Sequence, residues 1–212
     1  LIINIGGIAN ITHLPANKDI EPSGFDTGPG NTLLDEWIFK SQKKNYDSKG
    51  EWAESGSVIA NLLEDMMSDS YILKAAPKST GKEYFNLNWL TNLLKPYPNL
   101  KPEDIQRTLL EFTCLSIATS AYTIINNSNS KKPFCIYLCG GGINNSFLVE
   151  RLATLNQNIA IESTLDLGIH PQLVEASAFA WLASRTHADL PSNLKSATGA
   201  NSDKILGGSY PP

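Results

Sequence analysis

A single carboxylate set among glycines is the most unusual chemical feature of this sequence. Asp26 lies in the segment GFDTGPGN, residues 24–31, directly before a stretch that fits a helix. Glycines let a backbone approach a ligand closely, and a helix N-terminus attracts anions. A carboxylate in this setting can take a proton from a nucleophile during phosphoryl transfer. An aspartate that caps its own turn fits the same residues, so the segment alone leaves both interpretations open.

Two glycines near the start of the chain form a second candidate site. Gly6 and Gly7 lie between two apolar stretches in NIGGIANIT, residues 4–12, which also contains Asn10. The pattern predicts a β-hairpin with the glycines at its tip. The tip is either an ordinary tight turn or a hairpin that offers backbone amides to the phosphates of a nucleotide.

A third glycine cluster follows the apolar stretch FCIYLC, residues 134–139. Its members are Gly140, Gly141 and Gly142. A strand–glycine–helix junction is a usual place for nucleotide contact in α/β folds. It also resembles a dinucleotide fingerprint, with Glu162 about 20 residues further on, although Asn145 replaces the third glycine. An NAD-dependent oxidoreductase is therefore the rival interpretation.

The other candidate motifs are weaker evidence for a functional site. The segment APKSTGKE, residues 76–83, resembles a phosphate-binding P-loop, but Ala76 replaces its first glycine and Glu83 its final Ser or Thr. Because no buried strand precedes it, we reject that interpretation. Glu175 lies in the apolar segment VEASAFAWLA, where a carboxylate is either exposed or lines a polar cleft. The histidines show no metal-ligand spacing.

Composition limits the class of protein. The 212 residues are 42% hydrophobic and 18% charged, enough for one large domain or two small ones. The net charge of -4 and the absence of a basic stripe argue against nucleic acid or an anionic membrane as partner. No apolar run approaches the ~20 residues of a membrane span. The cysteine pattern predicts reduced, buried thiols and a cytoplasmic protein.

The periodicity of the sequence predicts an α/β fold with a mixed sheet flanked by helices. Residues 15–31 should form a loop, followed by a helix capped by Asn31, and a long helix should begin at Pro102. The chain begins without Met inside an apolar segment, which predicts that it is part of a longer protein. The expected strands are 1–5, 8–14, 134–139 and 159–163; the other expected helices are 57–67, 86–95, 145–156 and 172–187, before an extended surface tail, 189–212.

Six segments together carry a resemblance to a known family. In order they are NIGGIANIT, GFDTGPGN, APKSTGKEYFNL, CGGGINN, VEASAFAWLA and ATGA. With these segments the chain resembles, almost end to end, the anhydro-N-acetylmuramic acid kinase family. The resemblance implies the C-terminal lobe of a two-lobed hexokinase–actin–Hsp70-type (ribonuclease H-like) fold. It also implies ATP with Mg2+ as the phosphate source and N-acetylmuramic acid 6-phosphate, an intermediate of peptidoglycan recycling, as the product.

The resemblance assigns roles to individual residues. Asp26 matches the aspartate that activates the attacking water, and Glu175 and Gly28 match substrate-binding positions. The nucleotide-binding positions are Gly6, Gly7, Asn10, Gly140, Gly141 and Gly142. The family usually has glycine where Ala76 stands, and its N-terminal phosphate loop has no counterpart in these residues. Residues 1–212 are therefore expected to be one lobe, inactive alone, with a non-catalytic relative as a further alternative and a homodimer as a candidate assembly.

Overall fold

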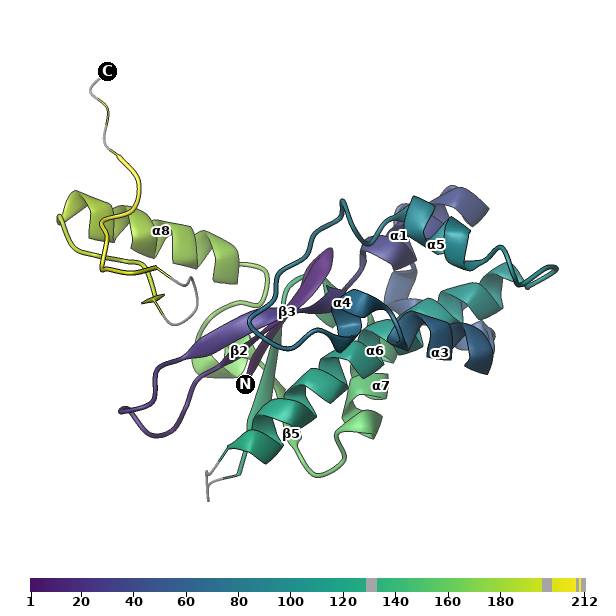
Figure 1. Ribbon diagram of the computed structural model, residues 1–212, viewed down its shortest axis with the longest axis horizontal. Coiled ribbons are helices and arrows are strands. Elements are labelled where there is room, and N and C mark those ends of the chain that lie inside the picture. Colours follow the sequence, from purple (N-terminus) through teal and green to yellow (C-terminus); the bar gives the residue numbers. More distant parts are fainter. Residues whose placement is uncertain (129–132, 196–199, 209, 211–212) are drawn as a thin grey trace.

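A mixed β-sheet with helices packed against it forms the body of the protein (Figure 1). The computed structural model describes residues 1–128, 133–195, 200–208 and 210. The sheet has five strands in the order β3-β2-β1-β4-β5; β1, β2 and β3 are antiparallel neighbours, and β4 and β5 run parallel to β1. This confirms the predicted α/β class with a mixed sheet. The strands are β1 (Ile2–Ile5), β2 (Ile8–His13), β3 (Ser23–Pro29), β4 (Cys135–Cys139) and β5 (Ala160–Ser163).

The α-helices occupy about half of the chain outside the strands. The segments predicted as helices are helical, with ends that differ by up to three residues, whereas the short helices α2 and α4 were not predicted. The helices are α1 (Thr32–Gln42), α2 (Glu51–Ser55), α3 (Ala60–Met67), α4 (Ser70–Leu73), α5 (Leu87–Leu93), α6 (Pro102–Asn127), α7 (Ser146–Leu155) and α8 (Val174–His187).

Helix α6 is the central element of the core. It begins at Pro102, as predicted, with Glu103 and Asp104 in its first turn, where carboxylates favour the positive end of the helix dipole. It packs against β2 and β3 of the sheet and against α1, α2, α3 and α7. By length and composition alone α6 could cross a membrane, which the sequence prediction overlooked. Most of its apolar stretch is buried inside this fold, as in any core helix.

The strands bury one face of the sheet under α6 and leave the other face more open. In β1, Ile3 and Ile5 are fully buried, whereas Asn4 between them is only half-buried. In β2, Ala9 and Ile11 are fully buried and Asn10 points to the opposite face. This alternation is the period of two that a half-covered sheet requires.

Strand β3 corrects the prediction of a loop over residues 15–31. The glycines and Pro29 of β3 suggested a loop, but an edge strand tolerates both residue types. The outer edge of β3 is also partly covered, because the backbone N–H of Asp26 donates to the carbonyl of Lys78 (3.2 Å). The β1–β2 hairpin lies inside the sheet, since β4 and β3 flank it on its two sides.

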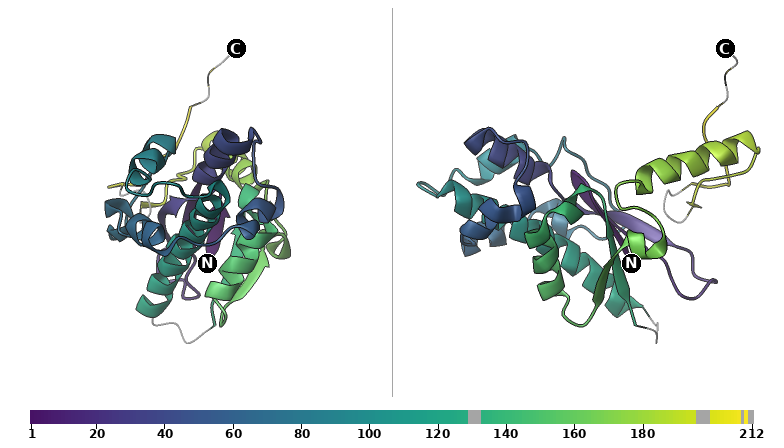
Figure 2. Two further views of the ribbon diagram at one scale, coloured as in Figure 1. Left: turned by 90° about the vertical axis from the view of Figure 1, so that its right-hand side faces the viewer. Right: turned by 180° about the vertical axis from the view of Figure 1, so that it is seen from behind.

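Helix α8 stands apart from the other helices (Figure 2). None of its residues is fully buried. The described part of the following segment turns back along it, since the Arg185 guanidinium donates to the carbonyl of Pro191 (2.6 and 3.0 Å) and Ser192 N–H to that of Lys204 (3.1 Å). Residues 197–199 of the ATGA motif lie outside the described residues.

The cysteines largely follow the prediction. All three are free thiols. Cys114 and Cys139 are buried, and burial raises the pKa of the Cys114 thiol above its usual range. Cys135 is only half-buried, because it lies at the first position of β4 on the more open face of the sheet.

Candidate active site

A row of polar side chains crosses the open face of the sheet. Asn4 in β1 is paired with Asn10 in β2, and Asn10 is paired with Asp26 in β3. Directly paired residues on neighbouring strands place their side chains on the same face. A β-bulge beside Asn10 shifts the register so that Asp26 joins this row. The fold therefore aligns two predicted site residues, Asn10 and Asp26, with Asn4, which was not predicted.

The carboxylate of Asp26 is held by the loop that follows α4. Ser79 Oγ donates to Asp26 Oδ2 (2.9 Å), and the backbone N–H of Thr80 donates to the same oxygen (3.0 Å). The hydroxyl of Tyr71 donates to the backbone carbonyl of Asp26 (2.8 Å). Among the described residues, no donor bonds to Oδ1 of Asp26. One oxygen is thus fixed by two bonds, and the other can accept a proton.

The loop that holds Asp26 is the segment in which we rejected a P-loop. Ser79 and Thr80 belong to APKSTGK, and sequence reasoning assigned them no role. A Ser-Thr pair in a loop with Pro and Gly is a common turn pattern, so nothing local indicated a partner 53 residues away. The structure identifies the partner as the predicted base.

Glu175 lies at the other end of the row. Its side chain is exposed at the start of α8, and its Oε1 accepts a long hydrogen bond from Asn4 Nδ2 (3.4 Å). Burial raises the pKa of the neighbouring Cys139 thiol to about 11, and the charge of Glu175 adds to this rise. The open face therefore carries two carboxylates, Asp26 and Glu175, with two asparagines between them.

The hairpin tip packs on the start of α1. The carbonyl of Gly6 accepts the backbone N–H of Asn31 (2.8 Å), and that of Gly7 accepts the N–H of Gly30 (2.9 Å) and of Thr32 (3.1 Å). In a trans peptide the N–H points away from the carbonyl of the same unit. The N–H of Gly7 is therefore directed away from α1. This direction is compatible with the prediction that the amide faces a phosphate.

Asn31 does not act as the predicted side-chain N-cap of α1. Its side chain makes no capping bond, and its Nδ2 donates instead to the carbonyls of Ile5 (3.2 Å) and Gly6 (3.1 Å). The hairpin supplies nearby acceptors that the sequence did not reveal. Asn31 thus ties α1 to the hairpin tip.

The three glycines after β4 differ in how closely the neighbouring strand packs against them. Gly140 has a positive φ of 83°, and a Cβ there would lie 2.3 Å from Asn4 Oδ1. A Cβ on Gly142 would lie 2.4 Å from Ile5 Cγ2, so both glycines are needed for close packing against β1. A Cβ on Gly141 would meet nothing within 4 Å. Gly141 is therefore the member of the cluster that is open to a ligand.

A cavity of about 440 Å³ lies beside Gly141. It lies between the start of α1 and the turn after β4, and most of the residues that line it have polar side chains. These include Asn31, Asp35, Tyr46, Lys49, Asn144 and Asn145. Its position next to Gly141 gives the nucleotide-binding prediction a concave surface of suitable chemistry.

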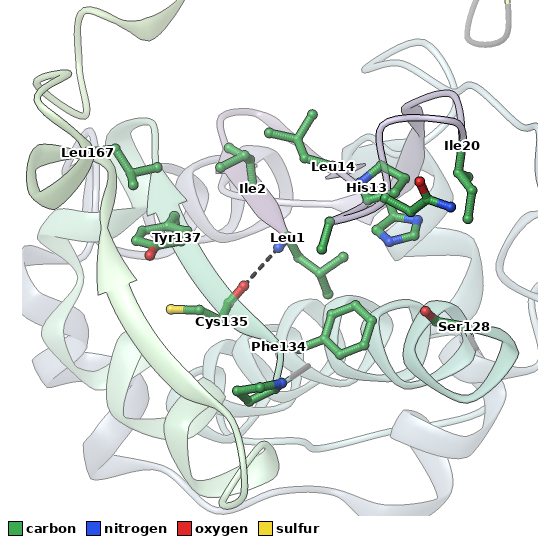
Figure 3. A pocket seen from close by; sticks show the side chains of 14 residues that line it. Leu1, Ile2, His13, Leu14, Ile20, Ser128, Phe134, Cys135, Tyr137 and Leu167 are labelled. Carbon is green, nitrogen blue, oxygen red and sulfur yellow. Dashed lines mark hydrogen bonds between the residues drawn. The ribbon is translucent and has the colours of Figure 1, made fainter. Parts of the chain in front are cut away.

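Another cavity, of about 480 Å³, lies away from this row (Figure 3). It is at the end of the sheet where β1 begins, and Leu1, His13, Phe134 and Tyr137 contribute to its wall. The amino group of Leu1 donates to the carbonyl of Cys135 there (2.7 Å). None of the predicted site residues lines this cavity, so we assign it no part in the chemistry.

The register of β5 argues against the dinucleotide interpretation. Glu162 is paired with Tyr137, two residues before the end of β4, and its carboxylate interacts with Cys135 and Tyr137. A ribose-binding carboxylate should instead lie at the end of the strand, beside the glycine turn. Glu162 therefore does not form a site with Gly140.

Gly28 is the remaining residue that was predicted to lie in the site. Gly28 is buried in β3, and a Cβ there would meet Ile72 Cδ1 (3.0 Å) and Ser116 Oγ (3.3 Å), so its substrate contact stays a prediction.

Within the described parts of the chain, no group of three or more His, Cys, Asp or Glu side chains could hold a metal ion.

Comparison with known proteins identifies the family. The family description anhydro-N-acetylmuramic acid kinase matches residues 1–212. A protein of that name from Shewanella baltica (strain OS155) is 47% identical over 210 residues, which cover 99% of this chain and 55% of the relative. One from Coxiella burnetii (strain Dugway 5J108-111) is 46% identical with the same coverage. The chain thus spans about half the length of these relatives. It belongs to the anhydro-N-acetylmuramic acid kinase family.

Proposed function

We propose that the full-length protein containing this chain is an ATP-dependent kinase of anhydro-N-acetylmuramic acid. It opens the 1,6-anhydro bond of the sugar with water and transfers the γ-phosphate of ATP to O6. The product is N-acetylmuramic acid 6-phosphate, an intermediate of peptidoglycan recycling in the cytoplasm. The observation that carries the proposal is the Asp26 carboxylate, fixed through Oδ2 and available through Oδ1 on the open face of the sheet.

Asp26 acts as the general base. It takes a proton from water as the water oxygen bonds to C1 of the sugar and the bond from C1 to O6 breaks. O6 then bonds to the γ-phosphorus, and ADP leaves with the electrons of the broken phosphoanhydride bond. A base must lie within hydrogen-bond reach of the proton that it takes, and a carboxylate anchored at one oxygen presents the other in a fixed direction.

The other groups bind the two substrates. Glu175 and Gly28 contact the sugar, while Gly6, Gly7 and Asn10 face the phosphates. The turn at Gly140, Gly141 and Gly142 contacts the nucleoside part of ATP, and the cavity beside Gly141 supports this assignment. Mg2+ accompanies the ATP and neutralises phosphate charge when bound. Since the described residues supply no cluster of three ligands, its protein ligands are expected outside them.

The chain is the C-terminal lobe of a two-lobed kinase of the hexokinase–actin–Hsp70 type. Its mixed sheet flanked by helices supports an α/β lobe of this kind, and its coverage of 55% of the relatives' length supports a chain that is one part of a longer protein. Phosphoryl transfer requires charge stabilisation from groups around the whole nucleotide, so residues 1–212 alone are inactive. A homodimer of the full-length protein is a further expectation.

The proposal is tested by incubating the full-length protein with anhydro-N-acetylmuramic acid, ATP and Mg2+. Formation of the 6-phosphate, detected by mass spectrometry, is the expected result. ATP binding without phosphoryl transfer to this or any other amino sugar would contradict the kinase and favour a non-catalytic sensor. Activity of residues 1–212 alone would contradict the two-lobe requirement.

A further inference from the structure

A half-buried carboxylate without a hydrogen-bond partner lines the cavity beside Gly141. It belongs to Asp35, in the first turn of α1. Among the described residues, no donor bonds to either of its oxygens, and both oxygens remain accessible. Burial raises the pKa of this carboxyl to about 6, so it is still mostly ionised at neutral pH. Because carboxylates away from bulk water normally have partners, Asp35 is free to accept hydrogen bonds from a ligand in the cavity.

The other charged groups of the cavity wall indicate which part of a nucleotide fits there. Asp47 also lines the cavity, but its two oxygens already accept the backbone N–H groups of Trp52 (3.0 Å) and Ala53 (2.9 Å). Against these two carboxylates the wall has Lys49. A net negative wall disfavours phosphate and suits a neutral group that carries hydrogen-bond donors. In a nucleotide, the ribose hydroxyls and the amino group of the base are such donors.

The position of Asp35 favours the ribose. Asn31 lines the same cavity, and its Nδ2 donates to the carbonyl of Gly6 at the hairpin tip (3.1 Å). Asp35 follows one helical turn later, since its N–H donates to the carbonyl of Asn31 (2.8 Å). Tyr46, the aromatic residue of the wall, also lines a separate cavity at the C-terminal end of α1, so it lies away from the tip. The sugar next to the phosphates therefore reaches Asp35, and the base can stack on Tyr46.

We propose that Asp35 binds the ribose hydroxyls of the nucleoside triphosphate and makes the site selective for a ribonucleotide. This rests on the proposed function, because it assigns the ribose of that substrate to the cavity beside Gly141. The two hydroxyls donate to the carboxylate, which gives charge-assisted hydrogen bonds. The phosphates continue past the hairpin tip, on the side to which the N–H of Gly7 points.

The test measures nucleotide affinity of the full-length protein by isothermal titration calorimetry. The probes are ATP, dideoxy-ATP, which lacks both ribose hydroxyls, and ITP, which lacks the amino group of the base. The wild type should bind ATP about tenfold or more tighter than dideoxy-ATP. Asp35→Ala should weaken ATP binding about tenfold and change dideoxy-ATP binding less than about twofold, so that the preference disappears.

Two further variants make the result specific. Asp35→Asn keeps the size of the side chain and removes its charge, and it should reduce the preference for ATP over dideoxy-ATP at least about threefold. Asp19→Ala removes the same charge from an exposed position in the loop between β2 and β3. It is the matched control and should leave the affinities for all three nucleotides unchanged. Circular dichroism checks that each variant is folded.

The direction of the change separates ribose binding from a general effect of charge. If the carboxylate only repelled phosphate, its removal would strengthen ATP binding. An ATP affinity that rises in the folded Asp35 variants, or falls equally for ATP and dideoxy-ATP, therefore overturns the proposal. A preference for ATP over ITP that disappears in Asp35→Ala, while the preference over dideoxy-ATP remains, assigns the base to Asp35 and overturns it as well.

The wild type alone distinguishes this proposal from the proposed function. A wild-type protein that binds ATP and dideoxy-ATP equally contradicts the ribose contact and leaves the proposed kinase standing. A wild-type protein that binds no nucleotide contradicts both.

Discussion

Ser79 Oγ donates a 2.9 Å hydrogen bond to Oδ2 of Asp26, across 53 residues of sequence. The same oxygen accepts the backbone N–H of Thr80. Two donors on one oxygen fix the plane of the carboxylate, and the second oxygen keeps its capacity to accept a proton. The loop after α4 therefore holds the Asp26 carboxylate in a fixed orientation, as the orienting partner of a general base does in many enzymes.

Removing the Ser79 hydroxyl should slow catalysis without abolishing it. In Ser79→Ala the Thr80 N–H still holds Asp26, but one charge-assisted bond of about 1.5 kcal/mol is lost. We expect kcat to fall about tenfold and KM for ATP to change little. Steady-state kinetics of the full-length protein measures both. Ser57→Ala, at an exposed serine before α3, is the control; an equal loss in both variants would remove the positioning role of Ser79.

Asp35 should make stability depend on pH. Burial raises its pKa from the usual 3.8 to about 6, the nearby Lys82 opposes the rise, and Asp47 adds to it. A carboxyl whose pKa is raised by folding stabilises the fold below its unfolded pKa, and that stability is lost as the pH rises through about 6.

Asp35→Asn should therefore stabilise the protein only at higher pH. Because the side chain is half-buried, solvent screening limits the gain to about 1 kcal/mol at pH 8, with none expected at pH 4. Urea unfolding of both proteins at the two pH values measures it. A gain of the same size at pH 4 and pH 8 would show that the charge of Asp35 is not its source.

The ion pair between α6 and α7 should contribute strongly to stability. Glu111 is only 6% exposed and accepts two bonds from Arg151 (2.7 and 3.0 Å), with Arg107 3.5 Å away. Glu111→Ala leaves both guanidinium groups without this partner and should cost about 2–4 kcal/mol in unfolding free energy.

The exposed pair of Lys195 and Asp203 provides the comparison. Its atoms lie at a similar distance, 3.1 Å, but both side chains are at least half exposed. Asp203→Asn should therefore change the unfolding free energy by less than about 0.5 kcal/mol. Equal losses of unfolding free energy for Glu111→Ala and Asp203→Asn would contradict the claim that burial makes the Glu111 ion pair the more stabilising of the two.

Local pattern was sufficient to predict the elements with strong periodicity. The hairpin with Gly6 and Gly7 at its tip, the apolar strand before Gly140 and the helix beginning at Pro102 all occur as expected. Each depends on residues that are neighbours in sequence. Strand β3 was missed because its pairing partner, β2, and not its own composition, determines its extended backbone.

The site was predictable only in part for a similar reason. Asp26 and Glu175 were singled out by their unusual surroundings in the sequence, and the structure places them on one face of the sheet. Asn4, which bonds to Glu175, and Ser79, which bonds to Asp26, act through partners 171 and 53 residues away. Contacts of that separation depend on strand order and loop placement, which periodicity does not encode.

The role of Asp26 as the base is the central claim, and Asp26→Asn in the full-length protein tests it most directly. Asparagine can keep the bonds from Ser79 and Thr80 through its amide oxygen but cannot take a proton, so the fold and the ATP affinity should be preserved. We predict that kcat for formation of the 6-phosphate falls by about 10³-fold or more. A kcat within about tenfold of the wild type would contradict the account.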